Sequence, residues 1–83
     1  MNVFKKSRSE FPDFKSYTGY RIGVIRSGKG MSREDLAKAS GVSVASIKAY
    51  ELGYTDPLLK TSCAIAKALG CSVDELCGFG EAS

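Results

Sequence analysis

The feature of this sequence that most constrains its fold is the repeated alternation of serine and glycine after residue 28. A serine at a helix N-cap accepts a hydrogen bond from a free backbone N–H group, and a glycine accepts the left-handed conformation that follows the last turn of a helix. Ser32 is followed by Gly41, and Ser43 by Gly53, each with a helix-sized stretch between them. These signals divide the chain into short helices joined by tight turns.

The first helix is expected from residue 14 to about residue 26, where pairs of apolar positions have i,i+3 spacing, and Gly28 and Gly30 end it. Gly19 and Gly23 each weaken this helix by about 1 kcal/mol relative to alanine. The first helix therefore needs contacts with other helices.

Four further helices are expected over residues 33–40, 43–52, 57–69 and 73–77. Pro57 suits the first turn of the fourth helix, and Ser72 with Glu75 forms a capping box for the fifth. No stretch alternates apolar and polar residues as a strand does. The sequence predicts an all-α domain of five short helices.

Length and composition predict one soluble domain, because 83 residues with 43% hydrophobic and 25% charged side chains are ordinary for a small globular fold. No apolar run approaches the roughly 18 residues of a membrane-spanning helix, and the start of the chain lacks the apolar stretch of a signal peptide. We expect a cytoplasmic protein without membrane contact.

We expect an N-terminal arm over residues 1–14, a helical domain over 15–78 and a tail over 79–83. The arm contains three phenylalanines and Pro12 without a helical or strand period. Two interpretations remain open: the aromatic side chains dock on the domain or a partner, or the terminus is unpacked.

Enzymatic chemistry has little support in the side chains. Histidine, the commonest general base and nitrogen ligand, is absent from the sequence. Cys63, Cys71 and Cys77 are spaced by eight and six residues, unlike the CxxC pairs of zinc and redox sites, so we interpret them as small buried apolar residues. We expect no metal, cofactor, small-molecule substrate or catalytic activity.

Charge is distributed unevenly along the chain. Residues 1–33 carry eight Lys or Arg against two acids, a net charge of +6, whereas residues 34–83 carry four against seven acids, a net charge of −3. A polyanion responds to local positive potential, so it would be attracted mainly to the first part of the chain.

The most informative segment is REDLAKASGVSVASIKAYEL, residues 33–52. Two short helices joined by a glycine turn form a helix-turn-helix unit. Ala37, four residues before Gly41, must be small because the helices approach closely there. Ile47 fills the angle between them together with Leu36 and Val42.

From residue 22 to residue 77, through IRSGKGMSREDLAKASGVSVASIKAYELG and PLLKTSCAIAKALGCSVDEL, the chain resembles the phage repressor and Cro type of helix-turn-helix domain. The resemblance implies a lambda-repressor-like fold with the motif at the second and third helices. It also implies an XRE-like, repressor-like transcriptional regulator that binds double-stranded DNA sequence-specifically.

The resemblance further implies which residues meet DNA, with the helix over 43–52 in the major groove. It assigns base contacts to Ser43, Val44, Ala45, Lys48 and Ala49, and phosphate contacts to Ser32 and Arg33 at the preceding helix N-terminus. The apolar members can sense a thymine methyl but cannot make bidentate hydrogen bonds to a base. Lys48 is equally compatible with a base, a phosphate or solvent.

After the predicted recognition helix the family commonly has a basic residue, but this chain has Tyr54 and then Asp56. A tyrosine can donate a hydrogen bond to phosphate, whereas an aspartate repels it. Ser40 and Ser62 also occupy positions that are often apolar in the family, which predicts a slightly smaller core.

Arg26 and Glu51 match positions that the family often joins by a salt bridge. Such a pair would fix the angle between the first and third helices and remove Arg26 from the surface that meets DNA. The alternative is two independent surface charges.

The resemblance also implies a homodimer, because such modules bind two half-sites one helical turn apart. Leu76, Cys77 and Phe79 form a candidate dimer surface, although Leu76 and Cys77 would equally complete the monomer core. The competing functional hypothesis is a protein-interaction module that keeps the scaffold without binding DNA.

Overall fold

The computed structural model describes residues 17–78, in which every regular element is a helix. The helices are α1 (Tyr17–Gly28), α2 (Arg33–Ser40), α3 (Val44–Glu51), α4 (Leu59–Leu69) and α5 (Val73–Cys77). This arrangement confirms the predicted all-α fold of five short helices. The predicted arm over residues 1–14, the tail over residues 79–83 and Phe79 lie outside the described residues.

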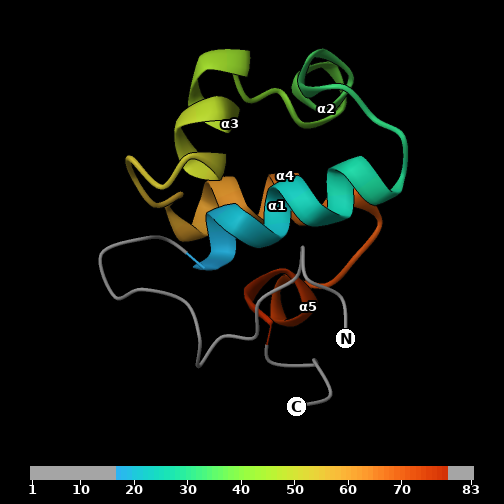
Figure 1. Cartoon of the computed structure of the whole chain (residues 1–83). Helices are drawn as coiled ribbons and strands as arrows, with labels where there is room; N and C mark the ends of the chain where they lie inside the picture. Colours follow the sequence, from blue (N-terminus) through green and yellow to red (C-terminus); the bar gives the residue numbers. More distant parts are fainter. Residues whose placement is uncertain (1–16, 79–83) are drawn as a thin grey trace, which may run out of the picture.

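The helices form two groups around α1 and α4. In Figure 1, α1 and α4 cross the middle of the domain, α2 and α3 lie on one side of them and α5 lies on the other. Helix α1 packs against α3 and α5, while α2 packs against α3 and α4. The helix-turn-helix pair therefore rests on a platform made by the first and fourth helices.

One apolar core joins all five helices. Leu36 of α2 and Ile47 of α3 are fully buried, and Val42 in the turn packs against them. These are the three residues predicted to fill the angle of the motif. The buried members of the core are Ile22, Leu36, Ile47, Ile65, Ala66, Leu69 and Leu76. Burial of each large aliphatic side chain contributes about 1.5–3 kcal/mol, so the angle between α2 and α3 is held mainly by packing.

The predicted cap signals act at the helix ends. Ser32 accepts a hydrogen bond from the Asp35 N–H, and the Asp35 carboxylate accepts one from the Ser32 N–H, which completes a capping box on α2. These hydrogen bonds lower the pKa of Asp35, because they favour its charged form. Gly41 has a φ of 75°, the left-handed region in which glycine is favoured. Ser72 and Glu75 form a second capping box on α5.

The start of α4 differs from the prediction. Leu58 is its N-cap, with extended backbone, so the helix begins at Leu59 and Pro57 precedes the cap instead of standing in the first turn. Proline has no backbone N–H group, and no N–H donor is needed either in the first turn of a helix or just before its N-cap. The sequence therefore does not distinguish these two positions for Pro57.

The cysteine prediction is wrong in part. Cys63 is exposed on α4, whereas Cys71 and Cys77 are partly buried, and all three are free thiols. Cys71 packs against the core, and burial raises the pKa of its thiol. Cys63 lies outside the core-facing side of α4, which positions 62, 65, 66 and 69 define. Within residues 17–78, no helix is long and apolar enough to cross a membrane.

Candidate nucleic-acid interface

Helix α3 presents its outer side to solvent. Ser43 caps it by accepting a hydrogen bond from the Ser46 N–H over 3.1 Å. Ser43, Ala45 and Lys48 are exposed, while Val44 and Ala49 are partly buried. No described residue covers the face that carries Ala45 and Lys48, so a groove of DNA has access to it.

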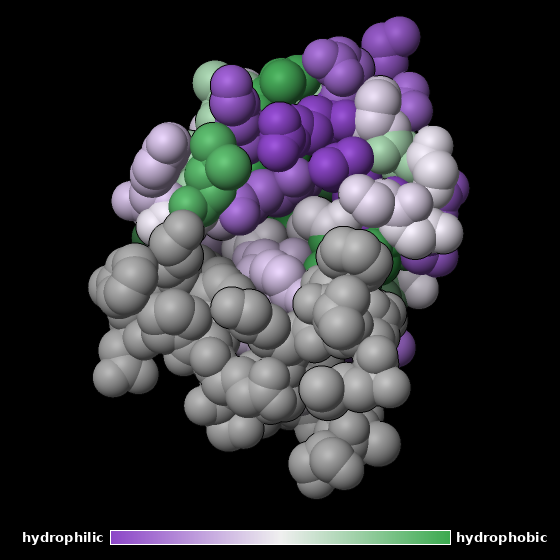
Figure 2. Space-filling view, viewed as in Figure 1, coloured by the Kyte–Doolittle hydropathy of each residue, from purple (hydrophilic) through white to green (hydrophobic). Residues whose placement is uncertain are grey.

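The N-terminus of α2 lies beside this face. An open hollow of about 550 Å³ is lined by Arg26, Ser32, Arg33, Glu34, Val44 and Lys48. Four of these, Ser32, Arg33, Val44 and Lys48, belong to the predicted site and come from two different helices. Three basic side chains, Arg26, Arg33 and Lys48, and the acid Glu34 border the hollow, and Glu51 pairs with the two arginines, so a net positive charge of about one remains. Figure 2 shows hydrophilic side chains gathered where α1 meets α2 and α3, with hydrophobic groups on the side of α3.

Three charged side chains converge at the wall of the hollow. Arg26 Nε lies 2.7 Å from Glu51 Oε2, and Arg26 Nη2 donates to Glu51 Oε1 over 3.0 Å. This bidentate contact confirms the predicted salt bridge. Arg33 Nε donates to the same Glu51 Oε1 over 3.0 Å, which the sequence did not predict. We name Arg26, Glu51 and Arg33 the arginine–glutamate cluster.

The cluster ties the ends of three helices together. The Glu51 side chain is only 6% exposed and that of Arg26 14%, so both charges are shielded from water. Arg26 Nη1 also donates to the carbonyl of Met31 over 2.7 Å. The hydrogen bond with Glu51 raises the pKa of Arg26, while burial acts in the opposite direction. The guanidinium therefore stays charged and holds α3 against α1 and the start of α2.

A glycine allows the close approach of α1 to Glu51. A Cβ atom on Gly23 would lie 3.3 Å from Glu51 Cδ, closer than an ordinary van der Waals contact. The weak helix former in the middle of α1 thus makes room for the carboxylate.

A comparison with known families places this architecture. The model of the helix-turn-helix family HTH_3 matches residues 25–76, which include α2, α3 and α4 in full. The chain belongs to this helix-turn-helix family.

Individual relatives agree with the family. A transcriptional regulator of the helix-turn-helix type from Methanocaldococcus jannaschii is 41% identical over 56 residues, which cover 68% of this chain and 85% of that protein. The restriction-modification controller protein C.AhdI from Aeromonas hydrophila superposes with a TM-score of 0.70 at 31% identity, covering 74% of this chain and 92% of that one.

The P22 c2 repressor in complex with a synthetic operator superposes with a TM-score of 0.66 at 36% identity, covering 71% of this chain and 89% of that one. The fold expected from the phage-repressor resemblance is thereby confirmed. This helix-turn-helix chain is a DNA-binding transcription regulator.

Two predicted site residues of the helix-turn-helix domain, Ser32 and Arg33, also stabilise the fold. The Ser32 hydroxyl accepts the capping bond of α2, and Arg33, whose side chain is 32% exposed, shares the Glu51 carboxylate. Tyr54 is 79% exposed and stands on the loop after α3, where its N–H donates to the Ala49 carbonyl over 2.9 Å. It does not line the hollow that the α2 and α3 residues share.

Sequence reasoning missed two side chains at this surface. Glu34 borders the hollow and places an acid near the expected phosphate contacts. Ser46 accepts a hydrogen bond from the Ser43 hydroxyl over 3.0 Å, next to the positions predicted to meet bases. The capping relation between positions 43 and 46 would have identified Ser46, because an N-cap side chain bonds to the third helical residue.

Proposed function

We propose that this regulator inserts α3 into the major groove of double-stranded DNA, as a homodimer of the repressor type in the cytoplasm. The observation that carries the proposal is the open outer face of α3 next to the N-terminus of α2. That arrangement lets one rigid unit meet base edges with α3 and a phosphate with α2.

The side chains of α3 differ in the contacts they can make with bases. Val44, Ala45 and Ala49 offer apolar surface that suits a thymine methyl, and Ser43 offers a hydroxyl. Lys48 is exposed and is the one basic side chain on α3. Sequence discrimination then depends on methyl contacts, on Lys48 and on the shape of the groove.

We assign phosphate binding to the start of α2 and to the loop after α3. The free N–H groups of the first turn of α2 attract an anion, and Ser32 and Arg33 lie at that turn. The Arg33 guanidinium bonds to Glu51 through Nε, so a phosphate would contact its Nη groups. Tyr54 is exposed and can donate to a second phosphate.

The proposal is tested by selecting bound duplexes from a random pool and then measuring affinity against salt. A dimer that makes about 6–10 phosphate contacts should lose about 10³ to 10⁵ in affinity between about 50 and 200 mM salt. A pool without an enriched sequence, or binding indifferent to salt, would contradict DNA recognition.

Lys48→Gln separates the three roles left open for this side chain, namely contact with a base, contact with a phosphate, or exposure to solvent without contact. A base contact predicts a change in the selected sequence, and a phosphate contact predicts a salt slope reduced by about one with the same sequence. Lys67→Gln is the matched control, because Lys67 is an exposed lysine on α4 outside the interface. Equal effects of the two substitutions would refute a specific role for Lys48.

The competing interaction-module hypothesis makes the opposite prediction. Ala45→Glu combined with Lys48→Glu places two acids against the expected phosphate ridges. This double variant should abolish DNA binding if α3 enters the groove. Unchanged DNA binding would refute the assignment of α3.

A further inference from the structure

We propose that the Ser40 hydroxyl is a positioning group that holds the turn between α2 and α3 and so sets the orientation of α3 for DNA. Ser40 is the last residue of α2, and its side chain is partly buried. Its Oγ atom donates a hydrogen bond to the Leu36 carbonyl over 2.7 Å and accepts one from the Val42 N–H over 3.2 Å. We name these two hydrogen bonds the serine clamp. The effect on DNA rests on the proposed function, whereas the clamp itself does not.

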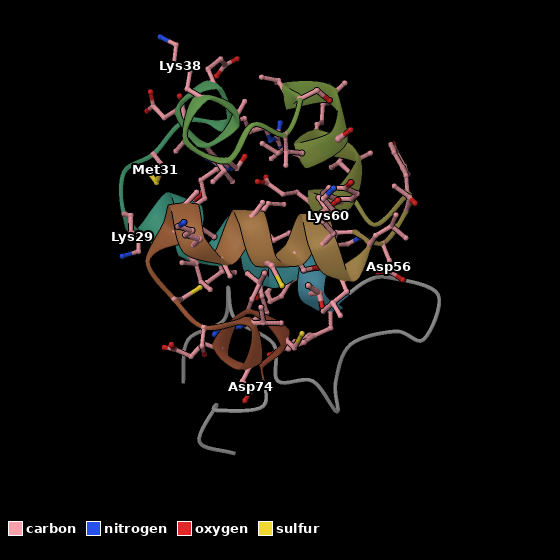
Figure 3. All side chains as sticks on the ribbon, turned by 180° about the vertical axis from the view of Figure 1, so that it is seen from behind. Lys29, Met31, Lys38, Asp56, Lys60 and Asp74 are labelled. Atoms are coloured by element: carbon pink, nitrogen blue, oxygen red, sulfur yellow. The ribbon has the colours of Figure 1, made fainter. Side chains whose placement is uncertain are left out.

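The Ser40 side chain faces the inside of the motif. Figure 3 shows Lys38 of α2 pointing away from the domain. Residues two apart on an α-helix differ by about 200° in direction, so Ser40 points the other way. There its hydroxyl reaches back four residues to a carbonyl of its own helix and forward to the N–H group that follows Gly41. The clamp therefore spans the point at which the chain leaves α2.

The N–H group of Val42 depends on this hydroxyl. Val42 packs against the core, and no backbone carbonyl of residues 17–78 accepts its N–H. A buried N–H group without a partner is unfavourable. Gly41, with its φ of 75°, ends α2, and glycine restricts the direction of the chain less than any other residue. The direction in which the chain enters α3 is then determined by the clamp together with apolar packing.

A continuous path of hydrogen bonds joins the two predicted DNA contacts of the motif. At the start of α2, the Leu36 N–H donates to the Ser32 carbonyl over 3.1 Å. The Leu36 carbonyl accepts from Ser40, and Ser40 accepts from Val42, which directly precedes Ser43, the N-cap of α3. The clamp is therefore the link between the end of α2 assigned to phosphate and the end of α3 assigned to bases.

The clamp replaces packing with directional contacts. Ser40 stands at a position that is often apolar in this family, where the turn would be held by hydrophobic contact alone. Hydrophobic contact is non-directional, whereas a hydrogen bond weakens steeply when its angle is distorted. Directional contacts suit a recognition helix whose small apolar side chains have to approach the bases closely.

Loss of the clamp should affect sequence discrimination more than general affinity. Non-specific binding comes from phosphate contacts, whereas discrimination comes from base contacts that require a fixed helix. The ratio of specific to non-specific affinity should therefore fall about three- to tenfold, the size of effect that one lost hydrogen bond produces. The number of phosphates contacted stays the same, so the slope of affinity against salt should not change.

Threonine and valine at position 40 form the matched pair that isolates the hydroxyl. They have nearly the same shape, but only Ser40→Thr keeps an oxygen that can bond to the carbonyl four residues earlier. Ser40→Val should lose discrimination, and Ser40→Thr should keep the wild-type ratio. Ser27→Ala is the control, because Ser27 is an exposed serine on α1 outside the motif. All proteins are compared well below their melting temperatures, which thermal unfolding provides.

The clamp is tested without DNA by hydrogen exchange of the Val42 amide, followed by NMR on the full chain. Exchange at Val42 should be about tenfold faster in Ser40→Val than in Ser40→Thr. The amide of Ile47, which donates to the Ser43 carbonyl inside the motif, reports the difference in overall stability that is subtracted. Equal corrected exchange at Val42 in the two variants would overturn the clamp.

The positioning role is tested by measuring affinity for a selected duplex and for a scrambled one between about 50 and 200 mM salt. Unequal exchange at Val42 with equal affinity ratios in Ser40→Val and Ser40→Thr would overturn this role. A reduced salt slope in Ser40→Val would also overturn it, because it would indicate a lost phosphate contact. A wild type that prefers no duplex would refute the proposed function and the effect of Ser40 on DNA, while exchange at Val42 would still decide whether the clamp exists.

Discussion

The arginine–glutamate cluster yields the sharpest prediction on stability. Glu51 accepts hydrogen bonds from both Arg26 and Arg33, whereas Arg26 contacts one carboxylate. Replacing Glu51 by leucine strands a guanidinium that is only 14% exposed. Replacing Arg26 by methionine leaves the carboxylate with Arg33 as a partner. The two single losses should therefore be unequal.

The magnitudes follow from burial. Removing one partner of a buried pair costs about 3–5 kcal/mol, so we expect about 3 kcal/mol for Glu51→Leu because Arg26 retains some water. Arg26→Met should cost about 1–2 kcal/mol, since the hydrogen bonds to charged groups that it breaks are partly replaced. The double variant removes both buried charges and should cost about 2 kcal/mol. The coupling free energy between Arg26 and Glu51 is then about 2–3 kcal/mol.

The assay is equilibrium unfolding in urea, monitored by circular dichroism, for the wild type, both single variants and the double variant. A domain of this size has a free energy of unfolding of roughly 4–12 kcal/mol. In a parallel thermal melt, a loss of about 3 kcal/mol should lower the melting temperature of Glu51→Leu by about 12–24 °C, at about 4–8 °C per kcal/mol for a domain of this size. Additive losses, or an Arg26→Met variant less stable than Glu51→Leu, would refute the proposed sharing of the carboxylate.

Two further predictions concern local features of the helices. Gly23→Ala should lower stability although alanine is the better helix former, because its Cβ would lie 3.3 Å from the Glu51 carboxylate, which two arginines hold in place. Gly28→Ala has free space around its Cβ and should be neutral or stabilising by up to about 1 kcal/mol. Equal melting temperatures of the two variants would contradict this reasoning. The capping hydrogen bonds lower the pKa of Asp35, so its contribution is present above the unfolded pKa of about 3.9 and is lost as pH falls through the lower folded value. The stability difference between wild type and Asp35→Asn should be full at about pH 6 and shrink below about pH 4 in pH-dependent thermal unfolding, and a constant difference would exclude the charge as its cause.

Most of the fold was predictable because it is determined by local signals. Ser32 with Gly41 delimits α2, and the left-handed φ of 75° at Gly41 is a conformation that glycine adopts without strain. Leu36 and Ile47 were predicted to be buried because the motif requires apolar side chains at its angle. The start of α4 was predicted two residues early, because proline suits positions on either side of a helix start.

The predicted DNA contacts stay predictions, but part of their arrangement followed from the sequence. Four of the eight predicted residues, Ser32, Arg33, Val44 and Lys48, border one hollow, because α2 packs on α3. The bond from Arg33 to Glu51 was not predicted, because it depends on how two side chains 18 residues apart meet in space. Sequence periodicity fixes the face of a helix but not the partner of a long side chain.

The unusual composition of α3 makes its orientation more important than its polar chemistry. The helix reads VASIKAYE, with one lysine, and its single acid is neutralised by the cluster. Contacts between small apolar side chains and a thymine methyl are individually weak and are lost with a small displacement. A recognition helix of this kind has to be held rigidly. The buried Ile47 and the carboxylate of Glu51 hold α3 at its inner side and at its end, which keeps its outer surface in the fixed orientation that the proposed groove contact requires.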